Sequence, residues 1–278
     1  MSCNGNSNGN FPDIREEILK NVSARRVVAS IIADGPGIIA GMALTVKEIE
    51  RLELELLMIA GEGQTICKGS EVARFAGTPK QIVMAEETLI GLLAKSSGIA
   101  TSALRFADAT GGKPQIVSGA WKKMPPSLKE LVREAVKAGG ASPRMVSEPF
   151  AYLDKNYIEL MGGVRKCLAA LAHLDGIVKV VQLKGRYGDI ASEACEAAMS
   201  GAGVVFIDSG NPRDIESVSE KLRSLGLRDK VRLAFGGGIK LDDIYLLKMT
   251  DIDLLDIGRP IVDAPLLDMR LEIMDIQK

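Results

Sequence analysis

The sequence predicts an α/β protein of two domains, a mixed α and β domain of about 110 residues followed by an α/β barrel. The 278 residues are 46% hydrophobic and 26% charged, enough to bury one large core or a core with a smaller partner domain. Helices and strands are expected in mixed order before residue 111 and in regular strand-then-helix order after it. The break falls at the turn Gly111-Gly112-Lys113-Pro114.

The first domain begins after a short polar leader. Residues 1–10 are rich in Asn, Gly and Ser and are predicted to be disordered, so the domain spans residues 11–111. Its expected elements, in order, are strands at 26–34 and 38–44, a helix with an apolar face at 46–60, a turn at 61–69, a strand at 71–76 and a long helix at 79–109.

The second domain, residues 112–268, alternates short apolar strands with helices. The expected strands are 115–117, 179–183, 204–208, 231–235 and 254–257, and the expected helices are 127–138, 163–174, 189–199, 212–225 and 241–248. Strongly apolar strands in this repeat are typical of a parallel sheet covered by helices, and the tight repeat favours a barrel over an open sheet. A count of six or seven strands indicates a partial or open barrel.

Composition excludes several classes of protein. A formal net charge of -1 gives no global field for nucleic acid or an anionic membrane. The longest apolar runs fall far short of the roughly 20 residues of a transmembrane helix, and the start of the chain lacks the pattern of a signal peptide. Four scattered cysteines and a single histidine, His173, argue against a zinc site and against a Ser-His-Asp mechanism. We expect a cytoplasmic protein with neither a nucleic-acid nor a membrane partner.

The strongest local pattern predicts a phosphate site. The strand at 231–235 runs into Gly236, Gly237 and Gly238, which let the backbone approach an anion before the next helix begins. The strand at 254–257 ends in Gly258 and Arg259, whose guanidinium can grip a phosphate. In α/β barrels the phosphate site recurs in the loops after the last two strands. The alternative is that these glycines only make tight barrel turns.

Charged residues at other strand ends fit the same chemistry. Asp208 closes the strand at 204–208 and is a candidate ligand for magnesium or a ribose hydroxyl, although it is also placed to cap the helix at 212–225. Four lysines in loops or at strand ends are candidates to reach a pyrophosphate, and most such lysines are only solvated: Lys122, Lys123, Lys155 and Lys184.

A set of ordered motifs resembles the quinolinate phosphoribosyltransferase family. Ser97-Gly98-Ile99-Ala100-Thr101 follows Glu86-Glu87-Thr88 by about ten residues, as in the Ser-Gly-Ile-Ala-Thr helix of that family. Similar order and spacing run over roughly residues 25 to 273. The further matches are residues 122–125, residues 135–140, Arg144, Asn156, residues 207–208, 236–239, 256–258 and 264–268.

The resemblance implies a fold and an assembly. The fold pairs an α/β sandwich with an incomplete, about seven-stranded α/β barrel, with residues 269–278 packing back on the N-terminal domain. The family's usual homodimer, or higher homo-oligomer, builds each active site from two chains, and the region around Glu87 would reach into the partner.

The resemblance also implies an activity. The family transfers phosphoribose from phosphoribosyl pyrophosphate (PRPP) to a ring nitrogen of a pyridine-like acceptor, and quinolinate then loses a carboxylate to give nicotinate mononucleotide for NAD biosynthesis. Magnesium and lysines stabilise the departing pyrophosphate. Asp208, the glycine loop and Gly258 match the phosphoribosyl side, and Lys122 or Lys123 falls near the catalytic lysine.

The departures from the family pattern lie where the acid substrate binds. Glu87 and Trp121 stand at or beside arginines of the pattern, and Pro143 replaces a histidine next to the retained Arg144. Asp154 replaces a lysine, with Lys155 adjacent to it.

Further along the chain, Gln182 replaces a strand-end glutamate and Tyr157 a histidine. Our hypothesis is a small-molecule phosphoribosyltransferase whose acceptor is less anionic than quinolinate, with Trp121 stacking on its ring and Glu87 or Asp154 accepting its hydrogen bonds. Two alternatives remain open: a non-catalytic paralogue that binds a phosphorylated metabolite, and a Schiff-base barrel enzyme that uses Lys184.

Overall fold

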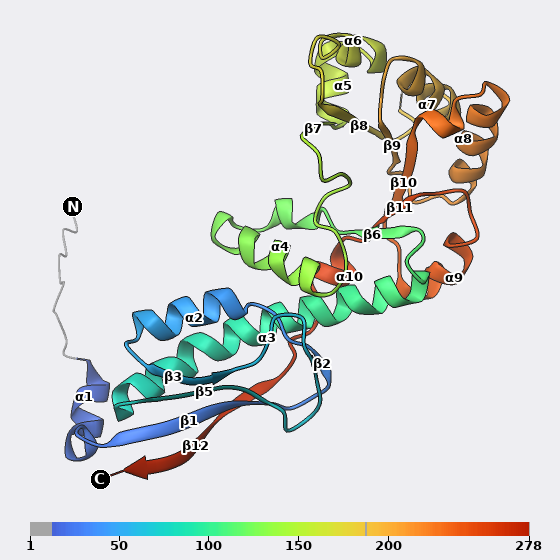
Figure 1. The fold of residues 1–278 in the computed structure, drawn as a ribbon. Coiled ribbons are helices and arrows are strands. Elements are labelled where there is room, and N and C mark those ends of the chain that lie inside the picture. The colour runs from blue at the N-terminus through green and yellow to red at the C-terminus, as the bar shows by residue number, and fades with distance from the viewer. Residues whose placement is uncertain (1–12, 187, 278) are drawn as a thin grey trace, which may run out of the picture. The chain divides into compact units, whose positions relative to one another are not determined.

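The computed structural model describes residues 13–186 and 188–277 as two compact units. The divisions fall between Lys95 and Ser96 and between Leu266 and Leu267. The predicted boundary near residue 111 lies at the end of helix α3 instead, whereas the division cuts through this helix (Figure 1). The predicted leader at residues 1–10 lies outside the described residues.

The first unit is built on an antiparallel sheet in the order β12-β1-β5-β3, and β12 pairs with β1 along its length. Its strands are β1 (Arg26–Ala33), β2 (Gly37–Ile38), β3 (Glu55–Ile59), β4 (Thr65–Ile66), β5 (Glu71–Gly77) and β12 (Met269–Gln277). Its helices are α1 (Ile14–Leu19), the 3-10 turn η1 (Lys20–Val22), α2 (Met42–Arg51) and the first part of α3 (Pro79–Thr110). Buried Ile31 and Phe75 of the sheet pack with Leu89 and Leu93 of α3 in one core.

Two predictions for this unit were wrong. The expected helix at 46–60 ends at Arg51, because Glu53 takes a left-handed φ of 55° and the apolar run after it pairs with β5 as strand β3. The expected strand at 38–44 is only β2, because Glu62 accepts hydrogen bonds from the N–H groups of Gly41 (3.0 Å) and Met42 (2.8 Å) and so caps a helix there.

The second unit is a parallel sheet of six strands, in the order β6-β11-β10-β9-β8-β7. The strands are β6 (Gln115–Val117), β7 (Phe150–Leu153), β8 (Val178–Leu183), β9 (Val204–Ile207), β10 (Arg232–Gly236) and β11 (Leu254–Asp256). A bridge between Val117 and Ser142 adds a single paired residue beyond β6. Strand β7 was not predicted from the sequence.

Helices follow the strands, as predicted (Figure 1). The α-helices of this unit are the second part of α3, α4 (Lys129–Ala138), α5 (Lys155–Met161), α6 (Val164–Ala169), α7 (Ile190–Met199), α8 (Arg213–Ser224), α9 (Ile244–Leu247) and α10 (Arg259–Val262). The 3-10 turns are η2 (Ala120–Lys123), η3 (Pro126–Leu128), η4 (Arg228–Lys230) and η5 (Leu241–Asp243). Helix α6 is shorter than the predicted 163–174, and α5 and α10 were not predicted.

The sheet curves into an incomplete barrel. Buried residues from β6, β8, β9, β10 and β11 form one core cluster, and Phe150 and Tyr152 of β7 pack against it. Because β6 and β7 are opposite edges of the sheet, a core shared by both requires the sheet to curl around it. The predicted fold class, an α/β sandwich with an incomplete barrel, is confirmed, with six strands in place of about seven.

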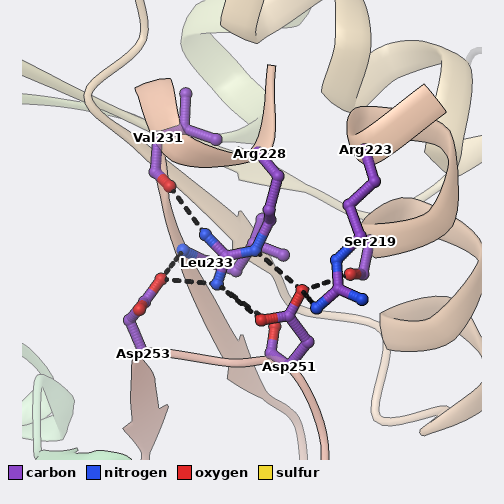
Figure 2. Close-up of polar contacts among 7 residues, drawn as sticks. All are labelled: Ser219, Arg223, Arg228, Val231, Leu233, Asp251 and Asp253. Carbon is purple, nitrogen blue, oxygen red and sulfur yellow. Dashed lines mark hydrogen bonds and ion pairs between the residues drawn. The ribbon is translucent and has the colours of Figure 1, made fainter. Parts of the chain in front are cut away.

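A polar network ties the β10–β11 connection to the α8–η4 region (Figure 2). Arg228, with 13% of its side chain exposed, contacts Asp251 through Nε (3.0 Å) and Nη2 (3.1 Å) and Asp253 through Nη2 (3.0 Å). Asp251 also accepts hydrogen bonds from Ser219 and from Arg223 (2.8 Å). Asp253 precedes β11 directly, so this network lies at the amino-terminal end of the strand. The predicted site residues follow the opposite, carboxyl-terminal ends of the strands.

Candidate active site

A cavity of about 750 Å³ opens at the carboxyl ends of the barrel strands. The residues that line it belong to β6, β7, β8, β9 or β11, follow β6, β9, β10 or β11, or lie at 143–145 ahead of β7. Parallel strands all end at one edge, so side chains that are distant in sequence meet there. The aromatic lining residues are Trp121, Phe150, Tyr152 and Phe206, the cationic ones are Lys122, Lys123, Arg144, Lys240 and Arg259, and the acidic ones are Asp208 and Asp256.

The glycine loop after β10 is held against the loop after β9. The Gly210 N–H donates to the Gly236 carbonyl (3.1 Å), and a Cβ on Gly237 would meet the Gly210 nitrogen at 2.6 Å. Gly237 and Gly238 have φ values of 113° and 76°, so both positions favour glycine. Both line the cavity, and Gly236 packs behind them against Phe206. The loop thus brings bare backbone to the cavity, as the sequence analysis predicted.

Asp208 stands at the end of β9 with two partners from the end of β8. Oδ2 of Asp208 accepts a hydrogen bond from Gln182 Nε2 (2.5 Å) and pairs with Lys184 Nζ (2.7 Å). Lys184 also contacts the Asp208 carbonyl oxygen (3.3 Å). Asp208 is therefore not the cap of α8, which was the alternative left open by the sequence: the N–H of Arg213, the first residue of α8, donates to Asn211 Oδ1 (3.3 Å).

A second carboxylate, Asp256, ends β11 beside Asp208. Its Oδ1 accepts a hydrogen bond from the Gly119 N–H (3.0 Å). Burial raises the pKa of Asp256, and the charge of Asp208 raises it further, against the lowering effects of Gly119, Lys122 and Lys123. The cavity is therefore lined by two carboxyl groups, Asp208 and Asp256, whose charges interact, and by several cationic side chains.

The aromatic wall is fixed in place by polar contacts. The indole N–H of Trp121 donates to the Pro143 carbonyl (2.7 Å), and the Arg133 guanidinium lies 4.9 Å from the centroid of the indole ring. The Lys122 ammonium lies 5.0 Å from the Tyr152 ring centroid. Burial, with Asp256 and Asp208, raises the pKa of the Tyr152 phenol, so it remains a neutral hydrogen-bond donor.

The structure brings most of the predicted site residues together in this cavity. Those that line it are Trp121, Lys122, Lys123, Arg144, Gln182, Asp208, Gly237, Gly238, Gly258 and Arg259. Arg144 is exposed, and the Arg259 backbone opens α10.

Three predicted residues are used elsewhere. Asp154 caps α5 by accepting hydrogen bonds from the N–H groups of Asn156 (2.9 Å) and Tyr157 (3.3 Å). Lys155 is the first residue of α5 and is not among the residues that line the cavity. Glu87 belongs to the first unit, where its carboxylate pairs with Arg15 Nη1 (2.6 Å).

Two residues of the cavity, Asp256 and Tyr152, were not predicted as site residues. Asp256 had a signal, because it is an acid at the end of a predicted strand, just before Gly258. Tyr152 had a weaker one: it alternates with Phe150 in a four-residue run too short to stand out as a strand.

Fold and site together define an α/β barrel with a glycine loop and an aromatic wall in one cavity. Models of the N-terminal and C-terminal domains of quinolinate phosphoribosyl transferase match residues 13–97 and 99–272. The chain therefore belongs to the quinolinate phosphoribosyltransferase family.

Similar proteins agree with this assignment. A probable nicotinate-nucleotide pyrophosphorylase (carboxylating) of Methanothermobacter thermautotrophicus is 30% identical over 271 residues, covering 96% of this chain and 95% of that protein. The human nicotinate-nucleotide pyrophosphorylase is 25% identical, covering 88% and 82%. The crystal structure of NadC from Streptococcus pyogenes has the same fold, with a TM-score of 0.79, 20% identity and coverage of 96% and 93%.

The family makes this chain an enzyme, a phosphoribosyltransferase, as the sequence analysis predicted. Neither alternative is favoured. The amine of Lys184 is engaged in an ion pair with Asp208, which opposes a role as a Schiff-base nucleophile. Cationic side chains, carboxylates and the glycine loop all line the cavity. A non-catalytic relative would be expected to lose such polar groups, and here they are present.

Proposed function

We propose that this enzyme transfers phosphoribose from PRPP to the ring nitrogen of a pyridine-like acceptor that is less anionic than quinolinate. The bond from ribose C1 to the pyrophosphate oxygen breaks, and a bond from C1 to the ring nitrogen forms. If quinolinate is accepted, carbon dioxide leaves as well and the product is nicotinate mononucleotide, a precursor of NAD.

One observation carries the proposal: a single cavity holds both the glycine loop and an aromatic wall. Four of the eleven aromatic residues of the chain line it. Phosphate groups fit bare backbone N–H groups and cations, whereas a heteroaromatic ring fits an apolar pocket with a few polar groups. A substrate pair made of a phosphorylated sugar and a flat ring would fill both parts.

The cations of the cavity fit the leaving pyrophosphate and the 5′-phosphate. We assign the pyrophosphate to Lys122 and Lys123, which follow β6, and the 5′-phosphate to the loop Gly236–Gly238 with Gly258 and Arg259. Positive groups fixed where negative charge develops lower the barrier because they need no reorganisation during the reaction.

Magnesium fits the acidic part of the cavity. Mg²⁺ is usually held by one or two carboxylates together with substrate phosphate oxygens, and Asp208 and Asp256 are two carboxyl groups in the cavity wall. Within residues 13–186 and 188–277 no group of three or more His, Cys, Asp or Glu side chains gathers as a metal site. Bound there with PRPP, the ion would neutralise pyrophosphate charge, with Asp208 as its protein ligand.

The acceptor preference follows from charge. Trp121 stands at or beside an arginine of the family pattern, and its N–H already donates to the Pro143 carbonyl. Loss of a charged partner typically costs a buried carboxylate about 2 to 5 kcal/mol. Arg144 remains as the cation next to Pro143, so an acceptor with one carboxylate fits this wall better than one with two.

We also propose a homodimer with shared active sites and a cytoplasmic location. Glu87 is 59% exposed at its side chain, which fits a role at an interface. The described cysteines Cys67, Cys167 and Cys195 are free thiols, as in a reducing compartment. No helix in the described part of the chain is long and apolar enough to cross a bilayer. Light scattering of the purified protein would test the dimer, and a mass of a single chain would contradict it.

The test of the proposed function is calorimetric titration of PRPP with magnesium into wild type and Asp208→Ala in parallel. Saturable binding to wild type that is lost in the variant supports the site. Pyrophosphate release is then followed with candidate acceptors, beginning with quinolinate and nicotinate. Unchanged pyrophosphate release by Asp208→Ala would discard the assignment of Asp208, and absence of PRPP binding to wild type would discard the proposed activity.

A further inference from the structure

Lys184 is a charged residue of the barrel mouth with no assigned role. It follows the end of β8, and Leu183 pairs with Ile207, so Lys184 stands next to Asp208 on the neighbouring strand. Side chains two residues apart on a strand point to the same face, and Gln182 therefore reaches the same carboxylate. The parallel register alone brings Gln182, Lys184 and Asp208 together.

Both donors use the same oxygen of Asp208. Gln182 Nε2 and Lys184 Nζ lie 2.5 and 2.7 Å from Oδ2. Lys184 makes a second contact with the Asp208 carbonyl oxygen at 3.3 Å, which ties the ammonium to both ends of the residue. The orientation of the carboxylate is thereby fixed, with Oδ1 as the oxygen offered to a ligand in the cavity.

The same contacts reduce the net negative charge at Asp208. The ammonium of Lys184 offsets the charge of Asp208, and Gln182 adds a donor without adding charge. A bare divalent cation gains little at a carboxylate whose charge is already balanced at 2.7 Å. An anion that carries its own metal, by contrast, gains from the nearby ammonium.

We propose that Lys184 is a positioning residue that makes Asp208 a one-oxygen, charge-compensated ligand, so that the cavity takes a divalent metal with a pyrophosphate ester but not as the free ion. This inference rests on the proposed function, and it gives the lysine a role distinct from that of a nucleophile. It also makes Gln182 a partner of the same oxygen.

The experiment measures two affinities on each variant of the full-length chain. Free Mn²⁺ binding is followed by electron paramagnetic resonance, and PRPP binding in the presence of magnesium by calorimetry. The variants are Lys184→Met, Lys184→Arg and Gln182→Glu. The matched control is Lys179→Met, at the other end of β8, where Nζ donates to the Leu174 carbonyl (2.9 Å) away from the cavity.

The expected shifts have opposite signs. Loss of the ammonium in Lys184→Met should tighten free Mn²⁺ binding about fivefold and weaken PRPP binding about tenfold. Lys184→Arg should restore both affinities, because a guanidinium keeps a permanent positive charge beside the carboxylate. Gln182→Glu should tighten Mn²⁺ binding by adding a carboxylate, and Lys179→Met should change neither affinity.

Each outcome bears on one idea. If wild type binds PRPP but Lys184→Met binds Mn²⁺ and PRPP as wild type does, Lys184 has no positioning role. Parallel loss of both affinities in Lys184→Met would indicate a structural role only, and would also overturn the inference. If wild type fails to bind PRPP at all, the proposed function fails instead.

Discussion

The N–H of Gly119 donates a 3.0 Å hydrogen bond to Oδ1 of Asp256, which joins the loop after β6 to the end of the neighbouring strand β11. This bond satisfies one oxygen of a carboxyl group whose charge is otherwise poorly solvated. The bond holds a carboxyl group of raised pKa in the cavity wall, within the electrostatic influence of Asp208.

Asp256→Asn should raise the thermal midpoint by a few degrees at neutral pH. The amide oxygen can still accept from Gly119, and the variant no longer buries a charge beside Asp208. Because burial raises the pKa of Asp256 above 3.8, wild type loses stability as pH rises from the unfolded towards the folded pKa. The difference in thermal midpoint between Asp256→Asn and wild type, measured by calorimetry, should therefore shrink at acidic pH. A difference that stays unchanged at acidic pH would contradict the raised pKa of Asp256.

Gly237→Ala should abolish saturable PRPP binding. A Cβ would lie 2.6 Å from the Gly210 nitrogen on a residue with φ of 113°, so the loops after β9 and β10 must separate. The matched control is Gly226→Ala, with φ of 62° and open space around its Cβ, which should cost only about 1 kcal/mol and leave binding intact. Tight PRPP binding by Gly237→Ala would show that the phosphate sits elsewhere.

Trp121→Ala should raise the KM for the acceptor about two- to tenfold and leave PRPP affinity unchanged, because an aromatic stack contributes roughly 0.5 to 1.5 kcal/mol. Steady-state kinetics at saturating PRPP would measure this with the acceptor identified in the pyrophosphate screen. Trp121→Phe, which keeps a ring but loses the bond to Pro143, should have a milder effect. An equal loss in both variants would assign the effect to the N–H instead of the ring.

Arg228→Met should lower the free energy of unfolding by about 2 to 4 kcal/mol, because it leaves Asp251 and Asp253 without their shared cation. Arg223 contacts the same Asp251 oxygen but is 63% exposed, so Arg223→Met should cost about 0 to 1 kcal/mol. Urea denaturation of both variants would measure the difference. Equal costs would mean that burial of the Arg228 contacts adds nothing.

Asp251 makes this network sensitive to acid. Burial opposes its charge, but hydrogen bonds from Arg228 and Ser219 outweigh burial and hold its pKa below 3.8. Its contribution to stability is therefore complete above about pH 5 and is lost as pH falls through the folded pKa. The difference in unfolding free energy between wild type and Asp251→Asn should be constant at neutral pH and narrow below about pH 4. A constant difference down to pH 3 would exclude this linkage.

The barrel was predictable because its signals are local. Apolar strands that end in Gly or Asp, such as those before Asp208 and Gly236, can be recognised from neighbouring residues alone, without knowledge of tertiary contacts. The first unit was harder. Helix α2 depends on Glu62, about 20 residues downstream, and strand β3 depends on pairing with β5. Neither dependence is visible in a window of neighbouring residues.

The site was predictable as a set of strand ends but not as a set of contacts. The residues at 122, 123, 208 and 237 reach one cavity because parallel strands end together. Gln182 and Lys184 both contact Oδ2 of Asp208, and this choice of oxygen depends on strand register and side-chain geometry. The capping of α5 by Asp154 depends on side-chain geometry in the same way. Sequence spacing does not specify these. The roles assigned to the individual residues stay predictions.

The fixed indole in the cavity wall gives this enzyme its own optical reporter. Trp121 is the single tryptophan of the chain, so all indole fluorescence originates in the wall of this cavity. A ligand that replaces water against the ring should shift its emission, and one that stacks on it should quench it. Occupancy of the site is therefore open to measurement in real time, on unlabelled protein and without turnover.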